Sequence, residues 1–93
     1  MNCYKLDENK KAVPCTLNEF SDGLSDRVMK QEAIGEAKVS TVFLGLDHNF
    51  MGGEPVLFET MIFGGKHGGY QKRCSTWEMA EKMHQDAVAL VEL

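Results

Sequence analysis

The chain has 93 residues, enough for one hydrophobic core and too few for two, so we expect a single domain over residues 1–93. Hydrophobic residues make up 43% of the chain and charged residues 26%, as in an ordinary folded globular protein. Ten basic residues against 14 acidic ones give a formal net charge of −4. This balance argues against general nucleic-acid binding, because the phosphate backbone would repel the chain.

The cysteines and the N-terminus bear on the compartment of the protein. Cys3, Cys15 and Cys74 show no CxxC spacing, so we predict neither a disulfide framework nor a zinc ribbon, and a reducing cytoplasm fits best. The N-terminal sequence MNCYKLDENKK lacks the apolar core of a signal peptide. No apolar run approaches the roughly 20 residues that a membrane span requires. We therefore expect no membrane association.

The N-terminal part predicts a short strand followed by a short helix. Residues 2–6 suit the strand. Thr16 and Glu19 form a capping box, so a helix should begin there. In this motif the threonine oxygen accepts a free backbone N–H, and the glutamate side chain accepts the backbone N–H of the threonine. Gly23 limits this helix to about two turns, over 17–24.

Four strands are expected next. The mixed pattern of residues 26–34 suits an outer strand, followed by a turn at Gly35 and Glu36. Residues 38–65 contain two dense apolar runs separated by a polar, glycine-bearing turn, the pattern of a long β-hairpin. Both of its strands carry apolar side chains on both parities, so we expect them to be central and covered on both faces. The hairpin strands and the short strand after them are 39–46, 55–63 and 70–74.

The register of the hairpin decides which way Glu59 points. If the hairpin folds about Met51, Glu59 lies opposite Phe43. A slip of one residue would send Glu59 to the other face relative to Phe43.

A second capping pattern, Ser75-Thr76-Trp77-Glu78, predicts a C-terminal helix with Ser75 as its N-cap, running to about Val91. Its apolar stripe should close one face of the sheet. The predicted order is β-α-β-β-β-β-α. This is an α+β fold, an antiparallel sheet of four to five strands with a short N-terminal and a long C-terminal helix packed on it.

The segment GGKHGGYQKR, residues 64–73, is basic within an acidic chain. Its glycines allow backbone N–H groups to approach an anion, and its basic and aromatic side chains suit a phosphate or nucleotide. The segment lacks Walker spacing, so a solvated hairpin loop is the alternative. The candidate ligand-binding residues here are Lys66, His67, Tyr70 and Arg73.

Four further polar residues are candidates for chemistry. Glu59 shares strand parity with apolar neighbours, so it either acts as a buried proton donor or ligand contact, or points outward and pairs. Asp47 and His48 end a strand, where they either form a polar cluster with His48 as a proton shuttle or simply cap a turn. His84 lies on the apolar stripe of the last helix, which suits a hydrogen-bonded core histidine or a group facing Asp47, Glu59 or solvent at the sheet edge.

Metal and nucleophile chemistry find little support in the sequence. His48, His67, His84 and Cys74 are scattered, with no two at the spacing of zinc ligands, so we expect neither a metal nor another cofactor. The chain also lacks a nucleophile elbow.

Three blocks of the chain resemble a widespread family of small proteins encoded by tailed phages and prophages. They are YKLDENKKAVPC at 4–15, VSTVFLGLDHNF with PVLFETMIFGG at 39–65, and STWEMAEKMH at 75–84. The family has no assigned activity, so the resemblance implies a phage-encoded accessory protein in the host bacterial cytoplasm and carries over no catalytic residues.

Our leading hypothesis is a non-enzymatic phage protein that counters bacterial immunity. It would bind a defence protein or sequester a cyclic nucleotide signal, the latter across a homo-oligomer interface. One alternative is a small hydrolase or lyase that uses Glu59 with His48 or His84. Another is a structural component of the phage.

Overall fold

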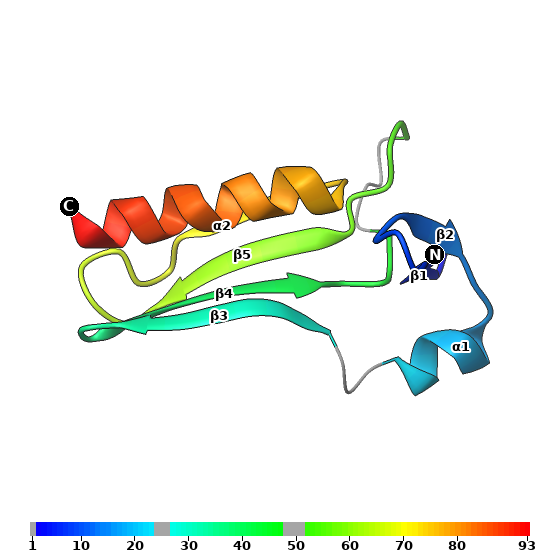
Figure 1. The fold of residues 1–93 in the computed structure, drawn as a ribbon, viewed down its shortest axis with the longest axis horizontal. Helices are drawn as coiled ribbons and strands as arrows, with labels where there is room; N and C mark the ends of the chain where they lie inside the picture. Colours follow the sequence, from blue (N-terminus) through cyan, green and yellow to red (C-terminus); the bar gives the residue numbers. More distant parts are fainter. Residues whose placement is uncertain (1, 24–26, 48–51) are drawn as a thin grey trace.

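A computed structural model describes residues 2–23, 27–47 and 52–93 of the chain. Within these ranges the elements follow the order β-β-α-β-β-β-β-α (Figure 1). Their bounds are β1 Tyr4–Leu6, β2 Ala12–Pro14, α1 Leu17–Asp22, β3 Val28–Ile34, β4 Ala37–Phe43, β5 Phe58–Phe63, β6 Gln71–Cys74 and α2 Trp77–Glu92. Neither of the two helices in the described ranges is long and apolar enough to cross a membrane.

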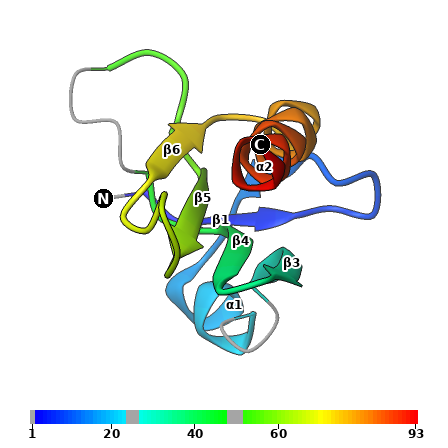
Figure 2. The ribbon, with the colours of Figure 1, turned by 90° about the vertical axis from the view of Figure 1, so that its left-hand side faces the viewer.

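The main sheet is antiparallel, with strand order β3-β4-β5-β6, and α2 runs along one of its faces (Figures 1 and 2). This confirms the predicted α+β class. The sequence prediction missed β2, which pairs with β1 in a separate two-stranded antiparallel sheet. Strands of three residues are too short to show an alternating pattern, which explains the omission.

The strands of the central hairpin are shorter than predicted. β4 ends at Phe43, because Gly45 has a φ of 76°, outside the extended region. β5 begins only at Phe58, after Pro55, which has no N–H to donate to a ladder. Between them, the Asp47 carboxylate accepts the backbone N–H of Val56 at 3.0 Å and so ties the two arms of the connection together.

The expectation that both central strands are covered on both faces is wrong. Of the two helices in the described ranges, α2 alone packs on the main sheet, whereas α1 contacts β1. The face away from α2 carries mixed side chains, among them Phe63, which is 46% exposed. An antiparallel sheet tolerates this arrangement, because one wet face is enough to accommodate its polar side chains.

The core lies between α2 and the sheet. Phe58 and Leu57 are buried towards the N-terminal end of α2, and Val39 and Ile62 towards its C-terminal end. The N-cap of α2 is Thr76 rather than Ser75, since the Thr76 hydroxyl accepts the N–H of Met79 at 3.2 Å. The predicted capping box of α1 is confirmed.

The register of β4 and β5 differs by one residue from a hairpin folded about Met51. Glu59 lies opposite Val42, and Phe58 lies opposite Phe43, where the two rings meet with their centroids 5.2 Å apart. Because side chains alternate along a strand, Glu59 points away from α2. This register places Phe43 and Phe58 side by side on the face that α2 covers.

Candidate ligand-binding pocket

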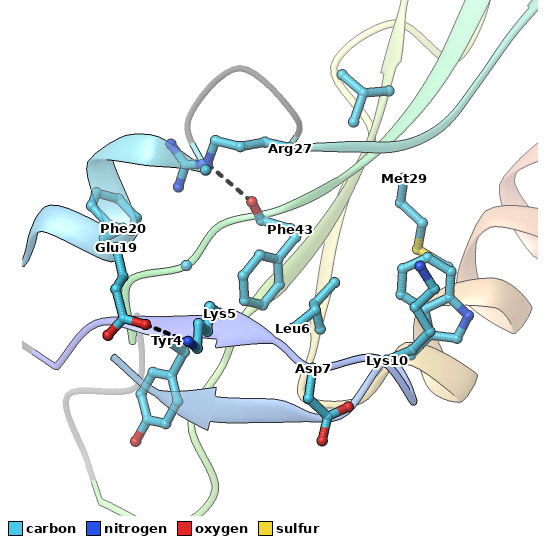
Figure 3. A pocket seen from close by; sticks show the side chains of 14 residues that line it. Tyr4, Lys5, Leu6, Asp7, Lys10, Glu19, Phe20, Arg27, Met29 and Phe43 are labelled. Carbon is cyan, nitrogen blue, oxygen red and sulfur yellow. Dashed lines mark hydrogen bonds and ion pairs between the residues drawn. The ribbon is translucent and has the colours of Figure 1, made fainter. Parts of the chain in front are cut away.

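A pocket of about 410 Å³ lies where the N-terminal segment meets the main sheet (Figure 3). Its walls come from the β1–β2 hairpin, α1, the start of β3, the end of β4 and the first residue of α2. Segments that are distant in sequence therefore build it. Its volume falls within the range of about 300–1,000 Å³ typical of small-molecule sites.

Gly45 allows α1 to approach the end of β4. A Cβ atom on this buried glycine would lie 2.6 Å from Cε1 of Phe20, closer than carbon atoms pack. Its φ of 76° also suits glycine better than other residues. Gly45 thus lets the Phe20 ring fit into the pocket wall.

Arg27 lies at one side of the pocket, held by the backbone and by an aromatic ring. Its Nε donates to the carbonyl oxygen of Phe43 at 3.2 Å, and its guanidinium carbon is 5.0 Å from the centre of the Phe20 ring. Burial lowers the pKa of Arg27 below its ordinary value, but a guanidinium remains protonated in proteins. The pocket therefore keeps a fixed positive charge here.

Lys10 lies at the other side. Its Nζ is 5.2 Å from the centre of the Trp77 ring, within the range of a cation–π contact. The hairpin turn that carries Lys10 is fixed by the Asp7 carboxylate, which accepts the backbone N–H groups of Asn9 and Lys11 at 2.8 and 2.9 Å. Figure 3 shows Arg27 and Lys10 on opposite sides of Leu6 and Phe43, which form an apolar floor between the two cations.

The acidic residues of the pocket are already engaged. Glu19 pairs with Lys5 and accepts the backbone N–H of Thr16, and these contacts lower the pKa of Glu19, with the Lys5 hydrogen bond as the largest cause. Asp7 is bound by the turn. Among the described residues no carboxylate forms an ion pair with Lys10 or Arg27. The pocket thus presents aromatic rings and two cations that have no ion-pair partner among the described residues, a combination that suits an anion bearing a flat ring.

The four residues of the basic loop predicted as a ligand site lie in three different surroundings. Lys66 and His67 line a different groove of about 450 Å³, beside the C-terminal end of α2. Tyr70 packs against the core instead. Arg73 donates to Glu59 at 2.8 Å on the sheet face away from α2.

Glu59 and His84, which the enzyme hypothesis pairs, lie on opposite faces of the main sheet. Glu59 is bound by Arg73 and Gln71 on the face away from α2. His84 is buried at 1% exposure on the α2 side. Of the remaining candidates, Asp47 belongs to the β4–β5 connection described above, and His48 lies outside the described residues.

His84 belongs to a buried polar chain that joins β3, β4, β5 and α2. Its Nε2–H donates to Glu32 at 3.0 Å, so in the neutral ring Nδ1 accepts the Thr41 hydroxyl at 2.6 Å. Thr41 also contacts the Thr60 hydroxyl at 2.5 Å. Both threonines are 0% exposed, so no substrate reaches them. These hydrogen bonds satisfy the buried polar groups of His84, Thr41 and Thr60. His84 is therefore a hydrogen-bonded core histidine, the first of the possibilities that the sequence left open.

The sequence analysis did not select Lys10, Arg27 or the aromatic residues around them. Phe20 and Trp77 read as core positions of helices, and Lys10 and Arg27 carry no local motif. The signal that unites them is spatial, because the folded chain brings together positions from both of its ends.

Comparisons with family models, with curated proteins and with solved structures found no match to this chain. A search of the described ranges found no three His, Cys, Asp or Glu side chains placed to hold a metal ion. The chemistry of the pocket is therefore the structural basis for proposing a function.

Proposed function

We propose that this chain is a non-enzymatic binding protein that sequesters a small anionic nucleotide in the pocket between the β1–β2 hairpin, α1 and β3. The observation that carries the proposal is the placement of Arg27 and Lys10 on either side of an apolar, aromatic floor, with no carboxylate among the described residues paired to either.

The two cations are suited to different parts of an anion. A guanidinium can pair with a phosphate through two parallel hydrogen bonds, and Nε of Arg27 is held on the Phe43 carbonyl, so its terminal nitrogens remain for the ligand. Lys10 supplies a mobile point charge at the opposite side. The floor of Leu6 and Phe43 offers an apolar surface for a base, and Phe20 and Trp77 supply aromatic walls.

This geometry gives no support to the Glu59–His84 pair of the hydrolase or lyase alternative, and His48, the other partner named for Glu59, lies outside the described residues. A general acid and its partner must lie within hydrogen-bonding reach directly or through one water, and the sheet separates Glu59 from His84. The structural-component alternative has no particular feature of the fold in its favour. Binding of a defence protein becomes an outcome of the experiment below.

At the level of the cell, we propose that the protein is a phage-encoded accessory factor that acts in the bacterial cytoplasm and removes a nucleotide immune signal. The resemblance of three sequence blocks to small phage proteins supports this role. Expression of the chain should then raise phage plating efficiency on a host that uses such a signal. The Arg27→Gln variant should fail to do so at equal protein level.

Isothermal titration of the protein against a panel of cyclic nucleotides tests the proposal. We expect one or more to bind, with Arg27→Gln and Lys10→Gln each weakening binding about 10- to 100-fold, the value of one charge-assisted hydrogen bond. Lys66→Gln and Arg73→Gln are matched controls, because they remove a cation of the basic loop segment and leave the pocket unchanged. They should bind like the wild type.

Two results would overturn the proposal. If no nucleotide releases heat, sequestration is wrong, and capture of a host protein by the wild type but not by Arg27→Gln would identify a protein-binding surface instead. If the control variants lose binding and the pocket variants keep it, the ligand binds at the basic loop.

A further inference from the structure

Two cysteines face each other across the β1–β2 hairpin. Tyr4 pairs with Pro14 in this ladder, so the next pair outward is Cys3 with Cys15. The backbone N–H of Cys15 donates to the carbonyl of Cys3 at 3.0 Å, which shows that the pairing extends to them. Cys3 is also held from its other side by a bridge to Leu46.

Residues placed opposite each other in such a ladder meet the backbone requirement for a disulfide. Directly opposite residues of a hydrogen-bonded antiparallel pair have Cα atoms about 5.5 Å apart, inside the range of about 4.4–6.8 Å found for disulfides. Their side chains also leave the same face of the ladder. The sequence alone does not indicate this pairing, because a full hairpin separates the two cysteines along the chain.

Accessibility differs among the three cysteines. Cys15 is partly exposed, whereas Cys3 and Cys74 are each 8% exposed. Cys74 is paired opposite Phe58 in the main sheet, and its thiol donates to the carbonyl of Thr76 at 3.7 Å. A reagent in solution therefore meets Cys15 first, and the partner directly opposite is Cys3.

We propose that Cys3 and Cys15 form a thiol–disulfide exchange site that a small-molecule disulfide, such as oxidised glutathione, converts into a disulfide closing the β1–β2 hairpin. The Cys15 thiolate attacks one sulfur of glutathione disulfide, forms a mixed disulfide and releases one glutathione thiolate. The Cys3 thiolate then attacks the Cys15 sulfur and releases the second glutathione. Two protein thiols are oxidised and one glutathione disulfide is reduced to two thiols.

The groups around Cys15 affect the rate of this exchange through the pKa of its thiol. Burial, then the neighbouring Cys3 thiol and the Glu19 carboxylate, raise the pKa of Cys15, and Lys5 acts in the opposite direction. Less thiolate is present at neutral pH than for an ordinary cysteine, so the reaction should accelerate as the pH rises, and about pH 8.5 suits the assay.

The test is incubation of the folded protein with oxidised glutathione, followed by thiol counting in denaturant. We expect the count to fall from three to one. Tryptic digestion without reductant should then yield residues 1–5 linked to residues 12–27, because cleavage after Lys5, Lys10 and Lys11 separates the two cysteines. Reduction should release both peptides.

Variants distinguish the pair from general oxidation. Cys74→Ala should give the same linked peptides, whereas Cys3→Ala should stop at the mixed disulfide and retain glutathione on Cys15. The proposal is overturned if the wild type also stops at that adduct, if the linked peptide contains Cys74, or if all three thiols persist. None of these results depends on the nucleotide proposal, so the two can fail separately.

Discussion

The two ends of the main sheet both carry basic and aromatic residues, but the contacts of these residues differ. At the basic loop, Lys66 lines a groove, Tyr70 is packed into the core and Arg73 is paired with Glu59. At the N-terminal end, Lys10 and Arg27 flank one shared pocket, and neither forms an ion pair with a carboxylate in the part of the chain that the structure describes.

The difference shows that charges clustered along the sequence need not share one pocket in the folded chain. Neighbours on a strand alternate between faces, so Tyr70 and Arg73 cannot converge with Lys66 on one ligand without a special turn. Residues from five separate elements can converge, because each enters the pocket from its own direction. We expect substitutions at the two ends of the main sheet to differ in their effects on stability and on binding. The following experiments compare substitutions at these two ends.

The largest effect should come from the aromatic core beneath the pocket. Phe58→Ala removes a ring that is 1% exposed and contacts both Phe43 and Trp77, so it should lower the free energy of unfolding by about 3–5 kcal/mol. Urea denaturation followed by the fluorescence of the single tryptophan measures this. Phe63→Ala, at the other end of the same strand and 46% exposed, should cost less than about 1 kcal/mol. Equal costs would contradict the comparison.

An intermediate effect is expected from two glycines with positive φ. Gly69 has open space around it, so Gly69→Ala should cost only the backbone strain of about 1–2 kcal/mol. Gly45→Ala adds a clash with Phe20 and should cost about 1–3 kcal/mol more, the usual penalty of overpacking. Urea denaturation compares the two. If they cost the same, Phe20 adjusts freely and is not a fixed wall of the pocket.

The smallest effect concerns the polar chain midway between the two ends. The hydrogen bond from His84, followed in importance by Lys30, lowers the pKa of Glu32 in the folded state. A carboxyl group with a lowered folded pKa stabilises the protein fully above its ordinary value of 4.5, and this contribution disappears as the pH falls through the folded value. Glu32→Gln should therefore be less stable than the wild type at neutral pH.

Urea midpoints measured between about pH 7 and pH 3 follow this contribution, since they bracket the carboxyl titration. The difference in urea midpoint between the wild type and Glu32→Gln should decrease as the pH falls. Glu8→Gln, at an exposed position of the hairpin turn, is the control and should follow the wild-type curve. A difference that stays constant with pH would show that the Glu32 charge makes no contribution.

Most of the fold could be predicted from the sequence because its signals are local. The capping box at Thr16 and the apolar stripe of the last helix each lie within a few turns of chain, and both helices form where they were expected. The four strands of the main sheet also appear, with ends shifted by up to three residues. The sequence analysis missed the pairing of the short β1 and β2 strands and left the register of β4 with β5 open, because both depend on contacts that are not local.

The candidate site shows the same difference between what local signals predict and what depends on distant contacts. The sequence analysis selected Lys66, His67, Tyr70 and Arg73, because they are close together along the chain. It could not select Lys10 and Arg27, since the pocket that unites them exists only after the N-terminal hairpin folds against the end of the main sheet.

By itself, the sequence determined the helices, the strands and a core of one domain, because propensity, capping and hydrophobic periodicity act over a few residues. Only the tertiary structure decided that Glu59 points away from α2, that His84 is bound within the core, and that Cys3 faces Cys15. These outcomes depend on register and packing, in which a shift of one residue moves a side chain to the opposite face of a strand.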